Sequence, residues 1–163
     1  MVKLYLVRHG IAAEREEYTE DALRPLTSEG KQKTKQVAQQ LFKLGLRFDL
    51  ILTSPLVRAR QTADILKAIG LSSQLEESTH LTPEGDIYSW LTWWEEWHQD
   101  VNSLALVGHE PNLGEWTEIL VWGEAKGNLV VKKAGVIGVQ LPKDGSPVGR
   151  SLLFWLTPPK FLL

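Results

Sequence analysis

Short apolar runs alternate with amphipathic helical patterns along this chain, and this alternation constrains its fold more than any other feature. The runs at 3–7, 49–53 and 103–107 are typical of buried strands, and a weaker strand is expected at 74–78. Strands that alternate with helices predict βαβ units, which form a mainly parallel sheet covered on both faces. We therefore expect an α/β fold, a three-layer α/β/α sandwich.

Two further runs near the end of the chain, at 129–141 and 151–156, follow each other without an intervening helix. The stretch Gly145-Ser146-Pro147 between them is typical of a hairpin connection. Together they predict two or three antiparallel strands at one edge of the sheet.

Four helices are expected from their caps and apolar faces. Thr27 and Ser28 offer an N-cap, whereas Ser54 offers an N-cap followed by Pro55 at the first helical position. Gly70 is typical of a helix end. The expected helices run from 28 to 44, from 55 to 69, from 86 to 98 and from 111 to 122.

The third of these helices is rich in tryptophan. Its apolar residues recur at the spacing of one helix face, which favours a stripe buried in the core over a recognition surface. Trp93 lies at the flank of that stripe, so it is the best candidate for partial exposure and for contact with a partner. The stripe comprises Ile87, Trp90, Leu91, Trp94 and Trp97.

Composition indicates an ordinary globular protein with a single domain over residues 1–163, 43% hydrophobic and 23% charged. A net charge of -2 and an isoelectric point near 6.1 give no electrostatic argument for binding nucleic acid or an anionic membrane. The absence of cysteine excludes disulfides, a thiol nucleophile and a cysteine-based metal site. No apolar run approaches membrane-spanning length, and no signal-peptide pattern follows Met1, so we expect a cytoplasmic protein.

Cationic and imidazole side chains follow three of the expected strands. Arg8 and His9 end the first strand and are closed by Gly10, Arg58 follows the second, and His109 follows the strand at 103–107. Because ligands bind at the carboxyl ends of parallel strands, these residues are expected to meet at one edge of the sheet. Arginine matches phosphate with a fork of donors, and neutral histidine supplies a nucleophilic nitrogen, so the set predicts phosphoryl transfer through a phosphohistidine.

Each of these residues also has a plainer interpretation when it is taken alone. Arg58 could be a solvated cation on a helix surface, as Arg60 beside it is expected to be, and His109 could be a capping or core histidine. A metal site is the other alternative, but His80 and His98 lie in different segments. No carboxylate stands at ligand spacing from His9 or His109, so we expect no metal and no cofactor.

Five motifs in order resemble the histidine phosphatase (phosphoglycerate mutase-like) superfamily, and most closely its compact SixA-type phosphohistidine phosphatases. The similarity extends to the tail at Thr157-Pro-Pro-Lys160 and so covers nearly the whole chain. The motifs are Val7-Arg8-His9-Gly10, Arg24-Pro25-Leu26-Thr27-x-x-Gly30, Ser54-Pro55-x-x-Arg58-Ala59-x-Gln61-Thr62, Leu81-Thr82-Pro83-x-Gly85-Asp86 and Val107-Gly108-His109-x-Pro111.

The resemblance implies that His9 is the nucleophile and that Arg8, Arg58 and His109 form the phosphate pocket, with Arg24 and Gly10 as further substrate contacts. We expect the arginine charges to keep His9 neutral, and a bound phosphate dianion to favour the cationic form of His109. Phosphorylated His9 would then be hydrolysed by water, releasing inorganic phosphate.

The leaving group guides the expectation about the substrate. Larger mutase-like relatives carry a dedicated glutamate acid in a longer segment, which this chain lacks. An imidazole leaves as a neutral molecule when its other nitrogen is protonated, so a site without a strong acid suits phosphohistidine in a protein, such as a histidine phosphotransfer domain of a signalling relay. If Glu84 reaches the pocket as an acid, small-molecule phosphomonoesters become substrates instead. A catalytically silent module that binds phosphoproteins is the third alternative.

Overall fold

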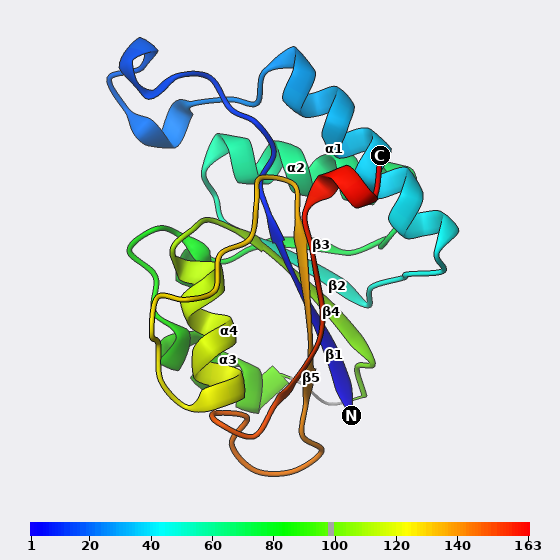
Figure 1. Cartoon of the computed structure of the whole chain (residues 1–163), viewed down its shortest axis with the longest axis vertical. Helices are drawn as coiled ribbons and strands as arrows, with labels where there is room; N and C mark the ends of the chain where they lie inside the picture. Colours follow the sequence, from blue (N-terminus) through cyan, green and yellow to red (C-terminus); the bar gives the residue numbers. More distant parts are fainter. Residues whose placement is uncertain (98–99) are drawn as a thin grey trace.

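A six-stranded mixed sheet lies between two pairs of helices in the computed structural model, which describes residues 1–97 and 100–163 (Figure 1). The strands are β1 (Val2–Arg8), β2 (Leu50–Thr53), β3 (Leu75–Glu77), β4 (Ser103–Gly108), β5 (Val136–Leu141) and β6 (Leu152–Thr157). Their order is β3-β2-β4-β1-β5-β6, with β3, β2, β4 and β1 parallel and with β5 and β6 antiparallel to their neighbours. The expected three-layer sandwich with an antiparallel edge is confirmed.

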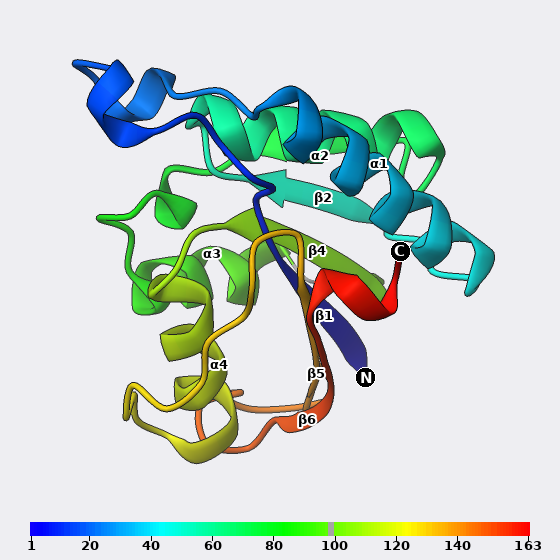
Figure 2. The same cartoon turned by 45° about the horizontal axis from the view of Figure 1, so that its top comes forward.

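The helices cover both faces of the sheet, as Figure 2 shows from a second direction. The α-helices are α1 (Ser28–Lys43), α2 (Val57–Ile69), α3 (Ile87–Trp97) and α4 (Asn112–Trp122), and the short 3-10 helices are η1 (Arg15–Glu17), η2 (Asp21–Leu23), η3 (Thr79–Leu81) and η4 (Pro159–Phe161). Strand side chains alternate between the faces: Leu4 and Leu6 pack under α3 and α4, whereas Tyr5 and Val7 pack under α1 and α2.

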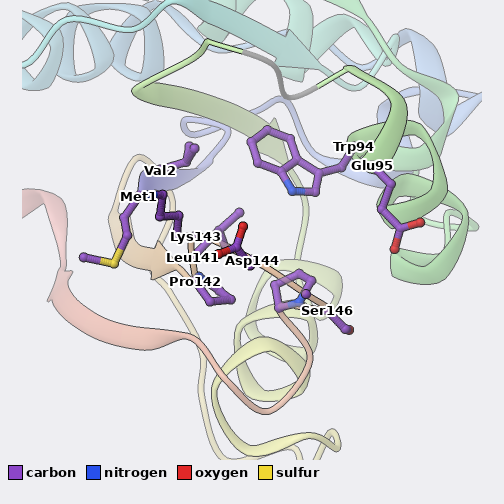
Figure 3. A pocket seen from close by; sticks show the side chains of 11 residues that line it. Met1, Val2, Trp94, Glu95, Leu141, Pro142, Lys143, Asp144 and Ser146 are labelled. Atoms are coloured by element: carbon purple, nitrogen blue, oxygen red, sulfur yellow. The ribbon is translucent and has the colours of Figure 1, made fainter.

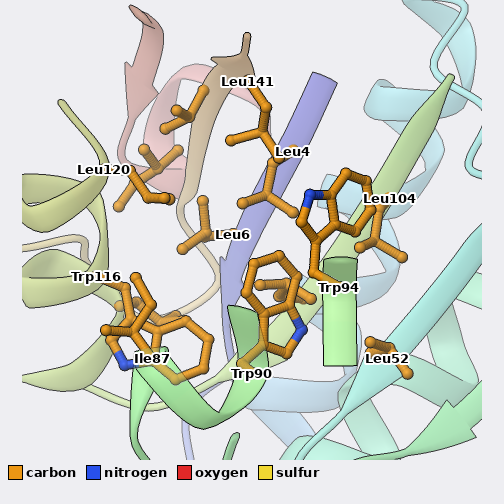
Figure 4. Packing of buried hydrophobic residues seen from close by; sticks show 14 of the residues in the cluster. Leu4, Leu6, Leu52, Ile87, Trp90, Trp94, Leu104, Trp116, Leu120 and Leu141 are labelled. Atoms are coloured by element: carbon orange, nitrogen blue, oxygen red, sulfur yellow. The ribbon is translucent and has the colours of Figure 1, made fainter. Parts of the chain in front are cut away.

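The tryptophan stripe of α3 is buried from Ile87 to Trp94, as its spacing predicts, whereas Trp97 is half-buried. Trp90 is fully buried and packs among leucines of β1, β2 and β4 in Figure 4, stacked on Trp94 with ring centroids 5.7 Å apart. Trp93 is half-buried, as expected for the flank of the stripe, and stacks on Trp97. The expected end of this helix at His98 lies outside the described residues.

Two expectations about element boundaries are wrong. Helix α2 begins at Val57 rather than at Ser54-Pro55, because the Ser54 hydroxyl accepts a hydrogen bond from the Leu56 amide and forms a turn before the helix. Residues 129–135, expected as strand, are irregular. They return to the end of β1, where the Ala134 amide donates to the carbonyls of Arg8 and His9.

The two ends of the strands differ in character. A cavity of about 460 Å³ lies where β1 begins and β5 ends, lined by Met1, Trp94, Glu95, Lys143 and Asp144 among others (Figure 3). At the opposite ends of the strands, residues 11–25 loop out beyond β1, drawn in blue in Figures 1 and 2. None of the described helices is long and apolar enough to cross a membrane.

Candidate active site

Strand register brings the predicted residues together. Arg8 at the end of β1 is paired with Gly108 at the end of β4, and the backbone ladder continues one step further, from the His9 amide to the Gly108 carbonyl. On the other side of β4, the Ser54 amide donates to the Val107 carbonyl, which brings the start of α2 to the same edge. The carboxyl ends of three parallel strands thus deliver His9, His109 and Arg58 to one place.

His9 is buried, with its Nδ1 bound to a backbone carbonyl and its Nε2 facing Arg58. Its Nδ1 lies 2.7 Å from the Gly10 carbonyl oxygen. Since a carbonyl can only accept, Nδ1 carries the proton and Nε2 carries the lone pair. Burial lowers the pKa of His9 to about 3, assisted by the charges of His109, Arg58 and Arg8 and opposed by the Gly10 carbonyl. His9 is therefore neutral near pH 7, with a nucleophilic nitrogen at Nε2.

His109 stands beside His9, with ring centroids 5.2 Å apart. Its Nε2 lies 2.8 Å from the Ser54 hydroxyl, and its buried Nδ1 has no hydrogen-bond partner among the described residues. Burial, followed by the charge of Arg58, lowers the pKa of His109 to about 3. Without an anion this histidine is also neutral, and its cationic form beside bound phosphate stays a prediction.

Arg8 is tethered by the segment that follows α4. Its Nη1 donates to the Val131 carbonyl at 3.0 Å, and its buried Nε finds no hydrogen-bond partner in the part of the chain that the structure describes. Glu110 ties this segment to α4, because its carboxylate accepts from the amides of Gly114 and Val131. Burial raises the pKa of the Glu110 carboxyl despite these bonds.

Arg58 is the second residue of α2, whereas the expected helix start at Pro55 would place it about one turn into the helix. Its side chain is only 5% exposed, and its Nε donates to His9 Nε2 at 3.3 Å. Asp21, which was not among the expected site residues, supplies the other partners: its carboxylate and its carbonyl accept from Arg58 Nη2 and Nη1 at 3.0 and 2.8 Å. The polar segment 11–25 shows no periodicity, so only its three-residue spacing from Arg24 could have indicated Asp21.

The other predicted site residues differ in how directly they are joined to the pocket. Arg24 donates to the Asp21 carboxylate and to the Ala13 carbonyl, which joins it to the pocket through Asp21. The Gly10 amide donates a hydrogen bond to the Thr62 hydroxyl at 3.1 Å. Glu84 is exposed, and in the described part of the chain no hydrogen bond or ion pair links it to the pocket.

The structure describes one of the two alternative histidines. His80 is half-buried beside Trp93 at the surface, and His98 lies outside the described residues. Across residues 1–97 and 100–163, no group of three or more histidine, aspartate or glutamate side chains is placed to hold a metal ion.

The chain is similar to known proteins over most of its length. Residues 4–115 match the histidine phosphatase superfamily (branch 1). The chain is 46% identical to a protein of Picosynechococcus sp. over 99% of both chains, and 29% identical to the phosphohistidine phosphatase SixA of Escherichia coli over 76% of each.

Solved structures show the same fold. The structure of SixA complexed with tungstate superposes with a TM-score of 0.87 at 26% identity, covering 99% of this chain and all of that one. A phosphoserine phosphatase of Entamoeba histolytica shares the fold with a TM-score of 0.70 at 19% identity, over the full length of both chains.

Proposed function

This chain belongs to the histidine phosphatase superfamily, and we propose that it removes phosphate from phosphohistidine in another protein without a metal ion. The family and the similarity to SixA support phosphatase activity. The observation that carries the proposal is the nitrogen Nε2 of His9, which is unprotonated, lies 3.3 Å from Arg58 Nε and feels the charges of Arg58 and Arg8.

In the first step, the lone pair of His9 Nε2 attacks the substrate phosphorus in line with the leaving nitrogen. A new P–N bond forms to His9, and the P–N bond of the substrate breaks. The electron pair of that bond returns to the substrate imidazole, which leaves neutral because its other nitrogen carries a proton. Arg8, Arg58 and His109 neutralise the charge on the equatorial oxygens, which is the main demand of phosphoryl transfer.

In the second step, water attacks phospho-His9. The Gly10 carbonyl keeps the proton on Nδ1, so the phosphorylated ring is cationic and departs readily when the P–N bond breaks. The electron pair returns to Nε2, and the hydroxyl and proton of water both remain on the product, dihydrogen phosphate. His9 is restored with its original tautomer.

The carboxylates around the pocket favour a P–N bond over an ester as the substrate. An alkoxide leaving group needs a proton donor, and ionised carboxylates only accept. Partial burial acts to raise the pKa of Asp21, but the hydrogen bonds and charges of Arg24 and Arg58 outweigh it and lower the pKa, so Asp21 is ionised. Glu110 is occupied by two backbone amides, and Glu84 is exposed without a link to the pocket.

A small-molecule phosphomonoesterase is the second candidate. The observation in its favour is the shared fold of the Entamoeba histolytica phosphoserine phosphatase. In that case Glu84 would have to move into the pocket as the general acid when substrate binds. A silent phosphoprotein-binding module has less support, because His9 already has a neutral, correctly protonated ring.

Turnover with chelator present separates these candidates. We expect wild-type protein in EDTA to dephosphorylate a ³²P-labelled histidine phosphotransfer protein rapidly and p-nitrophenyl phosphate slowly. Intact-mass analysis after a rapid alkaline quench should find one phosphoryl group on wild-type protein and none on His9→Ala. Arg58→Ala should lose activity, whereas Arg60→Ala, an exposed arginine of the same helix, should keep it.

The other outcomes are equally informative. Fast ester turnover that is lost in Glu84→Gln would identify a phosphomonoesterase. Loss of activity in EDTA would contradict the metal-independent mechanism. Turnover that survives in His9→Ala, or no turnover of either substrate, would overturn the proposal.

A further inference from the structure

Asp21 connects the segment between β1 and α1 to two arginines of the site. Its Oδ1 accepts from Nε and Nη2 of Arg24, both at 2.9 Å, and its Oδ2 accepts from Arg58 Nη2 at 3.0 Å. Its backbone carbonyl accepts from Arg58 Nη1 at 2.8 Å. One half-buried residue therefore joins Arg24 to Arg58 through a single carboxylate.

The atoms involved show which edge of the Arg58 guanidinium Asp21 occupies. A guanidinium presents two forks of N–H donors, an end fork of Nη1 with Nη2 and a side fork of Nε with Nη2. Asp21 bonds to both Nη atoms, which is the end fork. The side fork faces His9, because Nε donates to His9 Nε2. Asp21 thus holds the far edge, and the near edge is left facing His9, where a phosphoryl group on His9 Nε2 would lie.

There is a physical reason for Arg58 to need these contacts with Asp21. Arg58 is almost completely buried, and a long side chain of this kind has several rotamers that a single contact at Nε does not fix. A bidentate partner on the far edge defines the plane of the guanidinium and partly neutralises a charge that burial makes unfavourable. The fork is therefore aligned before substrate arrives.

We propose that Asp21 is a positioning residue, which orients Arg58 through its far edge so that the near edge meets the phosphoryl group during transfer to His9. This inference rests on the phosphoryl transfer proposed above. Asp21 acts through Arg58 and does not touch the reacting atoms.

The variant Asp21→Asn tests the inference, with Asp21→Ala as a second substitution. The surrounding segment should stay folded, because it is also held by the Leu26 amide on Gln61, by the bridge between Ala12 and Leu26, and by the Asp21 carbonyl, which both variants keep. We expect kcat for the phosphohistidine protein to fall about 10- to 100-fold, as for a misaligned catalytic group.

Binding of inorganic phosphate, measured by calorimetry, distinguishes positioning from a general structural defect. Removing the carboxylate leaves the pocket more positive, so phosphate should bind as tightly as to wild-type protein or tighter, although kcat falls. Glu20→Gln, an exposed acidic neighbour, should change neither quantity.

Three results would count against this role. If kcat of both Asp21 variants stays within twofold of wild type, the inference is wrong. It is also wrong if kcat rises, which would make Asp21 a competitor of phosphate, or if phosphate binding and thermal stability fall together with kcat. Absence of turnover in wild type and Glu20→Gln alike would instead refute the proposed function.

Discussion

The two histidines of the site are held neutral chiefly by burial, and this has a consequence for stability. His9 and His109 are 5% and 3% exposed, and each has its pKa lowered from 6.5 to about 3. The unfolded chain would protonate both rings below pH 6.5, whereas the folded protein would not do so until near pH 3. Between these limits the unfolded state binds more protons, so stability falls as the pH falls.

We therefore expect the free energy of unfolding to drop between pH 7 and pH 5, by up to about 2 kcal/mol for each histidine. Urea denaturation at the two pH values measures the drop, and comparison with His109→Gln isolates one ring. The variant should show a shallower dependence on pH, whatever its absolute stability. An equal dependence in both proteins would show that the pKa of His109 is the same in the folded and the unfolded state.

The residue types predict the histidines and arginines of the site but not the side chains that orient them. His9, Arg58 and His109 follow strands, and the connectivity of parallel strands places such residues at one edge. Asp21 and Ser54 act through hydrogen bonds to these residues across 37 and 55 positions of sequence, and no local pattern encodes such a bond. Because each contact depends on the folded loop geometry, it becomes visible only in the structure.

At the scale of elements, two helices approach the loops of the site through glycines in their first turns. A Cβ on Gly30 of α1 would collide with the Ile11 carbonyl, and a Cβ on Gly114 of α4 would collide with the Leu129 carbonyl. Both contacts are to backbone, which cannot swing aside as a flexible side chain can. These helices are therefore packed directly against the segments that carry Asp21 and the partner of Arg8.

Gly114→Ala should destabilise the protein and lower its activity together. In an ordinary helix interior this substitution stabilises by roughly 0.5–1 kcal/mol. Here the methyl group would push α4 from residues 129–131 and weaken the bond between Val131 and Arg8. Thermal unfolding and phosphatase assays measure both effects. Glu115→Ala, at the exposed neighbouring position, should be close to neutral, and a Gly114→Ala protein more stable than wild type would contradict this packing.

The segment before β5 shows where periodicity alone misleads. Residues 129–131 carry apolar side chains as a strand would, and Leu129 and Val131 are indeed buried. Their backbone, however, binds Glu110 and Arg8 instead of a neighbouring strand. Apolar alternation indicates burial. A loop packed over a site is buried in the same pattern as a strand, so the alternation does not distinguish a loop from a strand.

At the scale of the whole molecule, the alternation of strands and helices was sufficient to predict the architecture. Parallel strands need crossover helices, and each crossover covers one face, so the three layers follow from the pattern. The resulting sheet has an apolar cluster on each face, one under α1 and α2 and the other under α3 and α4. The site lies where the strands end, outside both clusters.

Stability and catalysis should therefore be separable by substitutions in the second cluster. Trp90 is fully buried there among Leu6, Leu104 and Trp116, whereas Trp93 on the same helix is half-buried. Trp90→Ala should cost about 3–5 kcal/mol, the usual range for truncating a buried aromatic residue. Trp93→Ala should cost much less, because much of its ring is already in water.

Urea denaturation compares the two variants, and phosphatase assays at a temperature where both are folded compare their sites. We expect kcat of each variant to stay near that of wild type, because both rings pack in or against the apolar cluster under α3 and α4. Equal losses of stability would mean that the half-buried ring contributes as much as the buried one. A large fall of kcat in folded Trp90→Ala would show instead that packing under α3 and α4 sets the geometry of the strand ends, and with it the placement of His9 and His109.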